Sequence, residues 1–243
     1  GACGPVVPGV DWIRFNEPED LGRITEETAC VLVEPVQGEA GVRIPQEGYL
    51  EALRRRCDEV GTLLIFDEIQ TGFGRTGEMF AMSKYGVTPD IVCLAKALGG
   101  GMPLGAFVSS GRIMECISHD PALGHITTFG GHPVCCAAGL AAMEYIIDEG
   151  LLGSVERKGA LFETLLGGHP AVKGIRRSGL LLAVELGESR KLYRIMEHFK
   201  ESGILSDWFL FCDTAFRISP PLTITDEEVA EVCRIVVDCL DRL

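Results

Sequence analysis

The sequence lacks several features that would assign it to whole classes of protein. It has no uncharged apolar run long enough to span a membrane and no internal repeat. Its ten cysteines form no CxxC pair and match no zinc-ligand spacing, so we expect neither a metal site nor a disulfide framework. Positive charge is scarce. With 22 Lys and Arg against 35 Asp and Glu, the net charge of −13 argues against nucleic acid or an anionic membrane as partner.

The remaining composition is that of an ordinary globular protein. The 243 residues are 47% apolar and 23% charged, which is enough for a sizeable core and one or two domains. Several cysteines lie within apolar runs, where a free thiol behaves as a small hydrophobic side chain. Free cysteines are typical of a reducing compartment, so we expect a cytoplasmic protein.

Two short apolar runs in the middle of the chain each end on one charged residue. The run Thr62–Phe66 leads to Asp67, and the run Ile91–Ala95 leads to Lys96. Apolar runs without polar alternation are typical of strands that are buried on both faces in a parallel sheet. Ligands of such sheets bind outside the carboxyl ends of the strands. We therefore expect Asp67 and Lys96 at the same edge of one sheet.

A lysine and an aspartate at one sheet edge suggest a particular chemistry. A lysine held beside apolar groups loses hydration, and its neutral amine can form a Schiff base with a carbonyl. Pyridoxal phosphate attaches to proteins in this way, and its ring nitrogen needs a carboxylate partner. Lys96 is then the candidate for the covalent attachment and Asp67 for the ring partner. The residues alone leave the alternative of a surface lysine and a turn-capping aspartate open.

Five ordered motifs show a family resemblance. The stretch FDEIQTGFGRTG is followed by PDIVCLAKALGGGMPLGA, and EPVQGEAG, TTFGGHP and FRISPPL occupy residues 34–41, 127–133 and 216–222. Together they resemble the class III (omega-amino) aminotransferases of pyridoxal-phosphate fold type I. The interval from Asp67 to Lys96, 96 − 67 = 29 residues, suits that family.

The resemblance implies an α/β fold with an αβα three-layer arrangement around a mostly parallel sheet. It places an incomplete large cofactor-binding domain at residues 1–150 and a small C-terminal α+β domain at 151–243. Enzymes of this family are considerably longer than this chain, which corresponds to their later portion. We expect the family's amino-terminal part, with its phosphate-binding loop, to be missing.

The resemblance also assigns cofactor contacts. Gln70 would contact the phenolic oxygen of the pyridoxal phosphate ring, and Ile69 would press on one ring face. Thr128 would reach the cofactor phosphate of a neighbouring subunit, which implies a homodimer with its sites at the interface. The family commonly has Asn where this chain has His132, so the local turn departs from the pattern there.

The resemblance assigns two further residues to the binding of two kinds of substrate. Arg217 would bind the α-carboxylate of a 2-oxo acid such as 2-oxoglutarate, because a guanidinium bonds a carboxylate with two parallel hydrogen bonds. Glu39 would pair with Arg217 while an omega-amine donor is bound, as in the ornithine, acetylornithine and 4-aminobutyrate enzymes. The chain is thus expected to be a transaminase for such small-molecule donors.

Two alternatives remain open from the sequence. The chain can be a catalytically silent fragment that acts only as a structural or association module. It can also be a pyridoxal-phosphate aminomutase or decarboxylase, since these enzymes share the aspartate and the lysine. Glu39 and Arg217 disfavour this last reading, because such enzymes have no need of a switched 2-oxo acid site.

Overall fold

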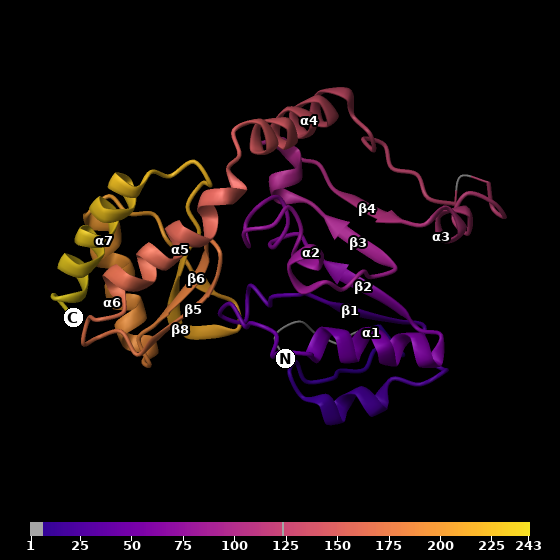
Figure 1. Ribbon diagram of the computed structural model, residues 1–243, viewed down its shortest axis with the longest axis horizontal. Coiled ribbons are helices and arrows are strands. Elements are labelled where there is room, and N and C mark those ends of the chain that lie inside the picture. Colours follow the sequence, from indigo (N-terminus) through magenta and orange to yellow (C-terminus); the bar gives the residue numbers. More distant parts are fainter. Residues whose placement is uncertain (1–6, 123) are drawn as a thin grey trace.

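Two four-stranded β-sheets organise the computed structural model, which describes residues 7–122 and 124–243 (Figure 1). The first sheet has the strand order β1-β2-β3-β4 and the second β5-β6-β8-β7. In chain order the elements are the 3-10 helix η1 Pro18–Arg23, β1 Cys30–Val33, α1 Tyr49–Val60, β2 Leu63–Asp67, α2 Ala81–Tyr85, β3 Ile91–Leu94, the 3-10 helix η2 Lys96–Gly99, β4 Ala106–Ser109, α3 Gly111–Glu115, α4 Pro133–Asp148, α5 Leu152–Leu166, β5 Gly174–Ser178, β6 Leu181–Glu185, α6 Ser189–Glu201, β7 Trp208–Phe209, β8 Cys212–Ile218 and α7 Asp226–Leu240.

The first sheet is mostly parallel, as the sequence predicts. Strands β1, β2 and β3 run parallel, with Phe66 opposite Val92 and Asp67 opposite Cys93. Strand β4 closes the sheet antiparallel to β3. Because β2 and β3 are parallel neighbours, their carboxyl ends meet at one edge of the sheet.

The described residues bury only one face of this sheet, so the expectation of burial on both faces is wrong for this part of the chain. Leu64 and Phe66 are fully buried in a cluster that includes Leu53 of α1. On the opposite face Ile65 is partly exposed, and Leu32 is 64% exposed. The described helices do not bury that face, whereas the apolar sequence of the strands suits burial on both sides.

The second sheet is antiparallel and carries the larger core. Strand β6 is buried along most of its length, and α5, α6 and α7 pack around it and against one another. Helix α7 begins with the capping box expected from the sequence: Thr225 accepts a hydrogen bond from the Glu228 N–H, and the Glu228 carboxylate accepts one from the Thr225 N–H. Among the described residues, no helix combines the length and apolarity that a membrane crossing requires.

Arg75 joins the two sheets. It follows β2, and its Nη1 donates hydrogen bonds to the Leu180 carbonyl at 3.1 Å and the Pro220 carbonyl at 2.5 Å. The Leu180 N–H donates in return to the Arg75 carbonyl at 3.0 Å. This close approach needs Gly179, whose φ is +59° and where a Cβ would lie 2.6 Å from the Arg75 carbonyl oxygen. One half-buried side chain thus links the loop after β2 to the second sheet.

Replacing Arg75 with methionine is expected to lower the free energy of unfolding by about 3–5 kcal/mol, because two carbonyls lose a charged donor while the apolar stem is kept. Urea titration followed by circular dichroism measures the change. Arg55→Met on the exposed side of α1 is the matched control, with an expected change of roughly 0.5 kcal/mol or less. Equal losses in the two variants would contradict the role given to Arg75.

Candidate active site

Asp67 and Lys96 lie at the same edge of the first sheet. Asp67 is the last residue of β2, and its Oδ1 accepts a hydrogen bond from the Ile69 N–H at 2.9 Å. Lys96 follows β3 as the first residue of η2. Glu34 follows β1 at the same edge, and the charges of Asp67 and Lys96 shift the pKa of its half-buried carboxyl in opposite directions.

Lys96 adopts an unusual backbone conformation. Its φ of +48° lies in the left-handed region, which a side chain with a Cβ occupies at a cost of about 1–3 kcal/mol. Such strained residues cluster at functional sites. Lys96 is exposed, so the expected desolvation of its amine is not found in this chain. Within the described residues its side chain makes no hydrogen bond and no ion pair.

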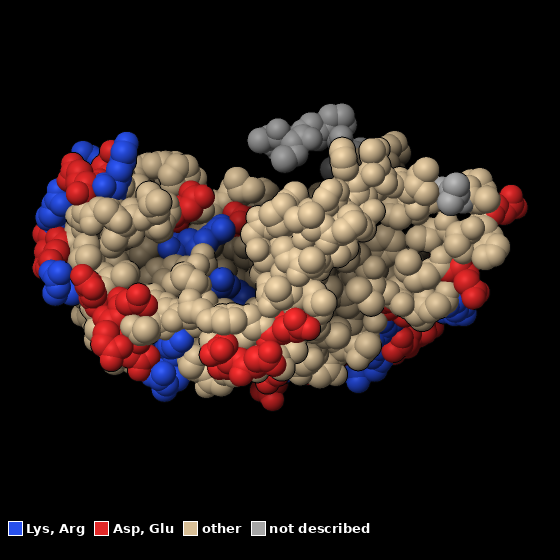
Figure 2. Space-filling model, turned by 90° about the horizontal axis from the view of Figure 1, so that it is seen from above, with Lys and Arg blue, Asp and Glu red and all other residues tan. Residues whose placement is uncertain are grey.

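A cavity of about 520 Å³ opens between the two sheets and brings four of the predicted residues together. Its lining includes Ile69, Gln70, Lys96 and Arg217, with further walls from α4 and from the segment that follows β8. Figure 2 shows this hollow between the two halves of the molecule, with basic side chains inside it. Segments that lie more than one hundred residues apart in the sequence therefore line the same cavity.

Glu39 is held by three donors at the side of this cavity. Its Oε1 accepts hydrogen bonds from Arg217 Nη2 at 2.7 Å and from Gln70 Nε2 at 3.0 Å. Its Oε2 accepts one from the Leu210 N–H at 3.2 Å. The structure thus forms the ion pair that the sequence predicts between Glu39 and Arg217, and adds Gln70 to it.

Gly38 makes the contact between Gln70 and Glu39 possible. A Cβ at position 38 would lie 2.6 Å from Gln70 Oε1, well inside contact distance. Any larger residue would push the amide of Gln70 away from its neighbour Glu39. The sequence motif contains this glycine, but only the structure shows which side chain it admits.

The environment shifts the pKa values of the two glutamates in opposite directions. Burial tends to raise the pKa of Glu39, but the hydrogen bonds from Arg217, Leu210 and Gln70 outweigh burial and hold it below its usual value. Burial raises the pKa of Glu34, and the charges of Asp67 and Glu39 add to the effect, against a hydrogen bond from the Gly38 N–H and the charge of Lys96. Glu39 is therefore the carboxylate that stays ionised beside Arg217.

Thr128 lies apart from this cluster. It is exposed, in a turn before α4, and it does not line the cavity. The neighbouring His132 takes the N-cap position of α4, where its Nδ1 accepts a hydrogen bond from the Val134 N–H at 3.3 Å. Histidine thus performs the capping that an asparagine side chain also performs.

Sequence reasoning missed the residues that support Arg217. The ring of Phe209 lies 4.7 Å from Arg217 Cζ, and the Leu210 N–H bonds Glu39. Nothing in the local sequence distinguishes Phe209 from an ordinary core residue, and a backbone N–H has no sequence signal at all. Arg75 belongs to the recognised motif, but its bonds to Leu180 and Pro220 join segments far apart in the chain.

Comparison with known families identifies the family of this chain. The family model for class-III aminotransferases matches residues 15–240. The chain belongs to the class-III aminotransferases. The family prediction made from the five motifs is therefore confirmed.

Curated relatives are longer than this chain. A putrescine aminotransferase of Pectobacterium atrosepticum is 40% identical over 98% of this chain and 54% of its own length. Ornithine aminotransferase 2 of Staphylococcus aureus is 43% identical over 93% of this chain and 56% of its own length. The chain spans about half the length of the curated relatives it matches.

Solved aminotransferase structures confirm the predicted fold type I. The ornithine aminotransferase of Toxoplasma gondii superposes with a TM-score of 0.90 at 36% identity, over 99% of this chain and 57% of that chain, and PLP partially occupies its active site. The acetylornithine aminotransferase of Elizabethkingia anophelis has a TM-score of 0.88 at 35% identity, over 99% of this chain and 62% of that chain.

Proposed function

We propose that this chain carries the substrate and cofactor residues of an omega-amino transaminase that uses pyridoxal phosphate. The observation that supports this most directly is the Glu39–Arg217 ion pair, whose Arg217 lines the same cavity as Lys96. A guanidinium that is paired with a carboxylate at 2.7 Å suits a site that takes two kinds of substrate in turn. The similar putrescine and ornithine aminotransferases point to the same reaction class.

The residues present fit pyridoxal phosphate. Lys96 offers an amine at the cavity wall, and Asp67 offers a carboxylate at the same sheet edge, with Ile69 and Gln70 following Asp67 along the chain. Bound there, the cofactor supplies an aldehyde for the substrate amine and a ring that withdraws electrons. Asp67 would hold the ring nitrogen protonated, Gln70 would contact the phenolic oxygen, and Ile69 would pack on the ring.

Lys96 and the Glu39–Arg217 pair have different roles in the proposed reaction. The Lys96 amine moves a proton at the reacting carbon of the donor, because it is held within reach of the cavity. Glu39 covers the Arg217 charge while a donor without a nearby carboxylate is bound. When a 2-oxo acid such as 2-oxoglutarate enters, its carboxylate replaces Glu39 on Arg217.

The assembly and the compartment are part of the same proposal. Thr128 and the apolar side chains of Phe129 and Val134 are exposed around the start of α4, as suits an interface with a second copy. Every cysteine among the described residues is a free thiol, which suits a reducing cytoplasm. We keep 1–150 and 151–243 as the proposed domains, of which residues 1–6 lie outside the described part.

The proposal is tested by incubating the chain with pyridoxal phosphate, 2-oxoglutarate and one donor at a time from ornithine, acetylornithine, putrescine and 4-aminobutyrate. Glutamate formation that needs both donor and 2-oxoglutarate supports the transaminase. Conversion of the donor without any 2-oxo acid, into a product that keeps its amino groups, would instead indicate a decarboxylase or an aminomutase.

A second candidate function follows from the open face of the first sheet. Leu32 on that face is 64% exposed and Phe107 36% exposed, which favours association with another polypeptide. In that case the isolated chain is a structural module that neither captures pyridoxal phosphate nor forms glutamate. Absence of both in the assay, from a folded chain, would select this candidate.

A further inference from the structure

The turn between β7 and β8 contacts both members of the Glu39–Arg217 pair. Phe209, the last residue of β7, is 1% exposed, and its ring lies 4.7 Å from Arg217 Cζ. At this distance an aromatic ring attracts a guanidinium through its electron-rich face. Arg217 Nε is buried and makes no hydrogen bond with the described residues, so the Phe209 ring and the Glu39 carboxylate both help to orient this side chain.

The two residues of the turn itself hold Glu39 through their backbone. The Leu210 N–H donates to Glu39 Oε2 at 3.2 Å, and the Phe211 N–H donates to the Glu39 carbonyl at 3.0 Å. Both side chains point away from the core and are 75% exposed. The turn therefore touches Glu39 through peptide groups while its side chains contribute little burial.

We propose that Phe209 and the turn that follows it, Leu210–Phe211, form a latch that holds Glu39 on Arg217 and thereby sets the affinity of Arg217 for a dicarboxylate ligand. This rests on the carboxylate-binding role of Arg217 proposed above. To release Arg217, Glu39 must leave the Leu210 N–H as well as the guanidinium, so the latch adds to the free energy of the closed pair. Phe209 acts from the other side, because it keeps the guanidinium in place when Glu39 departs.

Leu210 offers a precise probe of the latch. Leu210 is the first residue of a two-residue turn, and its φ is not positive. Phe209 before it is an extended strand residue. Proline favours this position of a turn and an extended residue before it. Leu210→Pro therefore keeps the turn and removes the N–H that bonds Glu39. Leu210→Ala is the matched control, since it removes the same exposed side chain and keeps the N–H.

Two readouts apply to each folded variant. Carbon-13 NMR of labelled glutamate side chains follows the titration of Glu39 and of its neighbour Glu34, with Glu39 assigned through Glu39→Gln. Isothermal titration calorimetry measures the affinity for glutarate, a dicarboxylate that has no keto group. We expect Leu210→Pro to raise the pKa of Glu39 and to bind glutarate roughly threefold to tenfold more tightly than Leu210→Ala.

A variant on the other side of the pair makes the test independent of the proline. Phe209→Met keeps most of the buried apolar volume and loses the aromatic face, so we expect weaker glutarate binding than in the unaltered chain by roughly threefold. Opposite changes in Leu210→Pro and Phe209→Met support the latch, because general loosening of the fold would weaken binding in both.

The outcomes separate the latch from the function on which it rests. An identical Glu39 titration in Leu210→Pro and Leu210→Ala overturns the latch. A shifted titration with unchanged glutarate affinity overturns its influence on the ligand. If the titration shifts but glutarate binds to none of the proteins, the turn does position Glu39, and the assignment of Arg217 as the carboxylate site is what fails.

Discussion

Replacement of Lys96 by alanine is expected to abolish the covalent capture of pyridoxal phosphate by this chain. The amine is exposed at the cavity and makes no hydrogen bond or ion pair within the described residues, so it is available to an aldehyde. Borohydride reduction of the chain with one equivalent of pyridoxal phosphate, followed by peptide mass spectrometry, would place the added mass on the peptide that contains residue 96. In Lys96→Ala this mass should be lost, along with any turnover.

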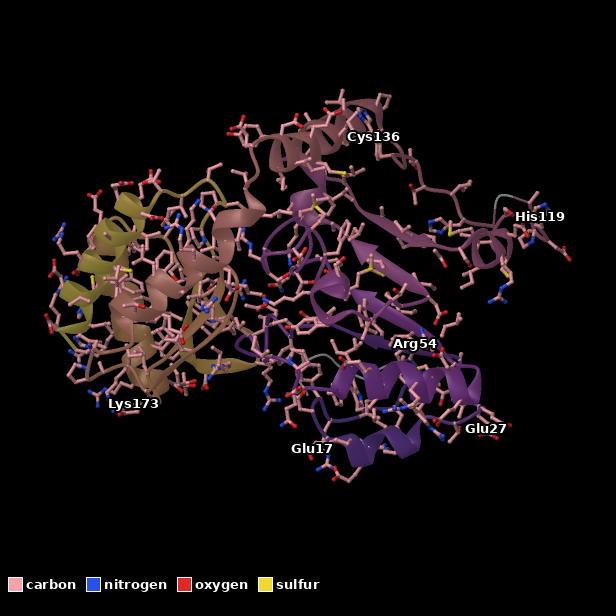
Figure 3. The ribbon with its side chains drawn as sticks, in the orientation of Figure 1. Glu17, Glu27, Arg54, His119, Cys136 and Lys173 are labelled. Carbon is pink, nitrogen blue, oxygen red and sulfur yellow. The ribbon has the colours of Figure 1, made fainter. Side chains whose placement is uncertain are left out.

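An exposed lysine away from the cavity provides the control. Lys173 is exposed at the outer side of the half built on β5–β8, and its Nζ donates a hydrogen bond to the Pro170 carbonyl at 3.4 Å (Figure 3). Lys173→Ala should capture the cofactor as the unaltered chain does. Label spread evenly over several lysines, or unchanged in Lys96→Ala, would show that position 96 has no special reactivity.

The position of Lys96 also shows how much of the site can be predicted from the sequence. An apolar run that ends on a charged residue predicts a strand and its end, and parallel pairing then predicts that Asp67 and Lys96 share an edge. Both predictions rest on local patterns, and the structure bears both out. The Thr225–Glu228 capping box is likewise a local pattern and forms as predicted.

Burial could not be predicted in the same way. The apolar residues of β1 and β2 indicate that both faces of the sheet suit an apolar environment. They do not indicate which segments of the chain cover those faces. In this chain Leu32 and Ile65 lie on a face that the described helices leave open. The same reasoning explains Lys96, whose expected desolvation requires neighbours that its own strand does not supply.

The contacts around Arg217 join residues that lie far apart in the sequence, so no local pattern predicts them. Glu39 and Arg217 are 178 positions apart, and only a family resemblance pairs them in advance. Phe209 follows from no motif, because a buried phenylalanine in a strand is ordinary. The Gly38–Gln70 contact likewise depends on where two loops meet.

Arg217→Met is expected to weaken glutarate binding roughly 100-fold or more, because the ligand loses its charged donor in a partly buried site. The same change leaves Glu39 beside the cavity without its cation, so the stability of the fold should also fall. Arg217→Lys keeps the charge and loses the fork of two donors, and we expect intermediate affinity. Isothermal titration calorimetry measures the affinity for glutarate of the unaltered chain and of both variants.

Glu39→Gln separates the two consequences of losing Arg217. A neutral amide competes less strongly for the guanidinium, so this variant alone should bind glutarate more tightly. Combined with Arg217→Met, it removes the unpaired carboxylate, and the double variant should recover stability while remaining unable to bind glutarate. Because the two residues share one hydrogen bond at 2.7 Å, their effects on stability should not add. Strict additivity would mean that the pair does not act as a unit, and the alternation between donor and 2-oxo acid would then need another basis.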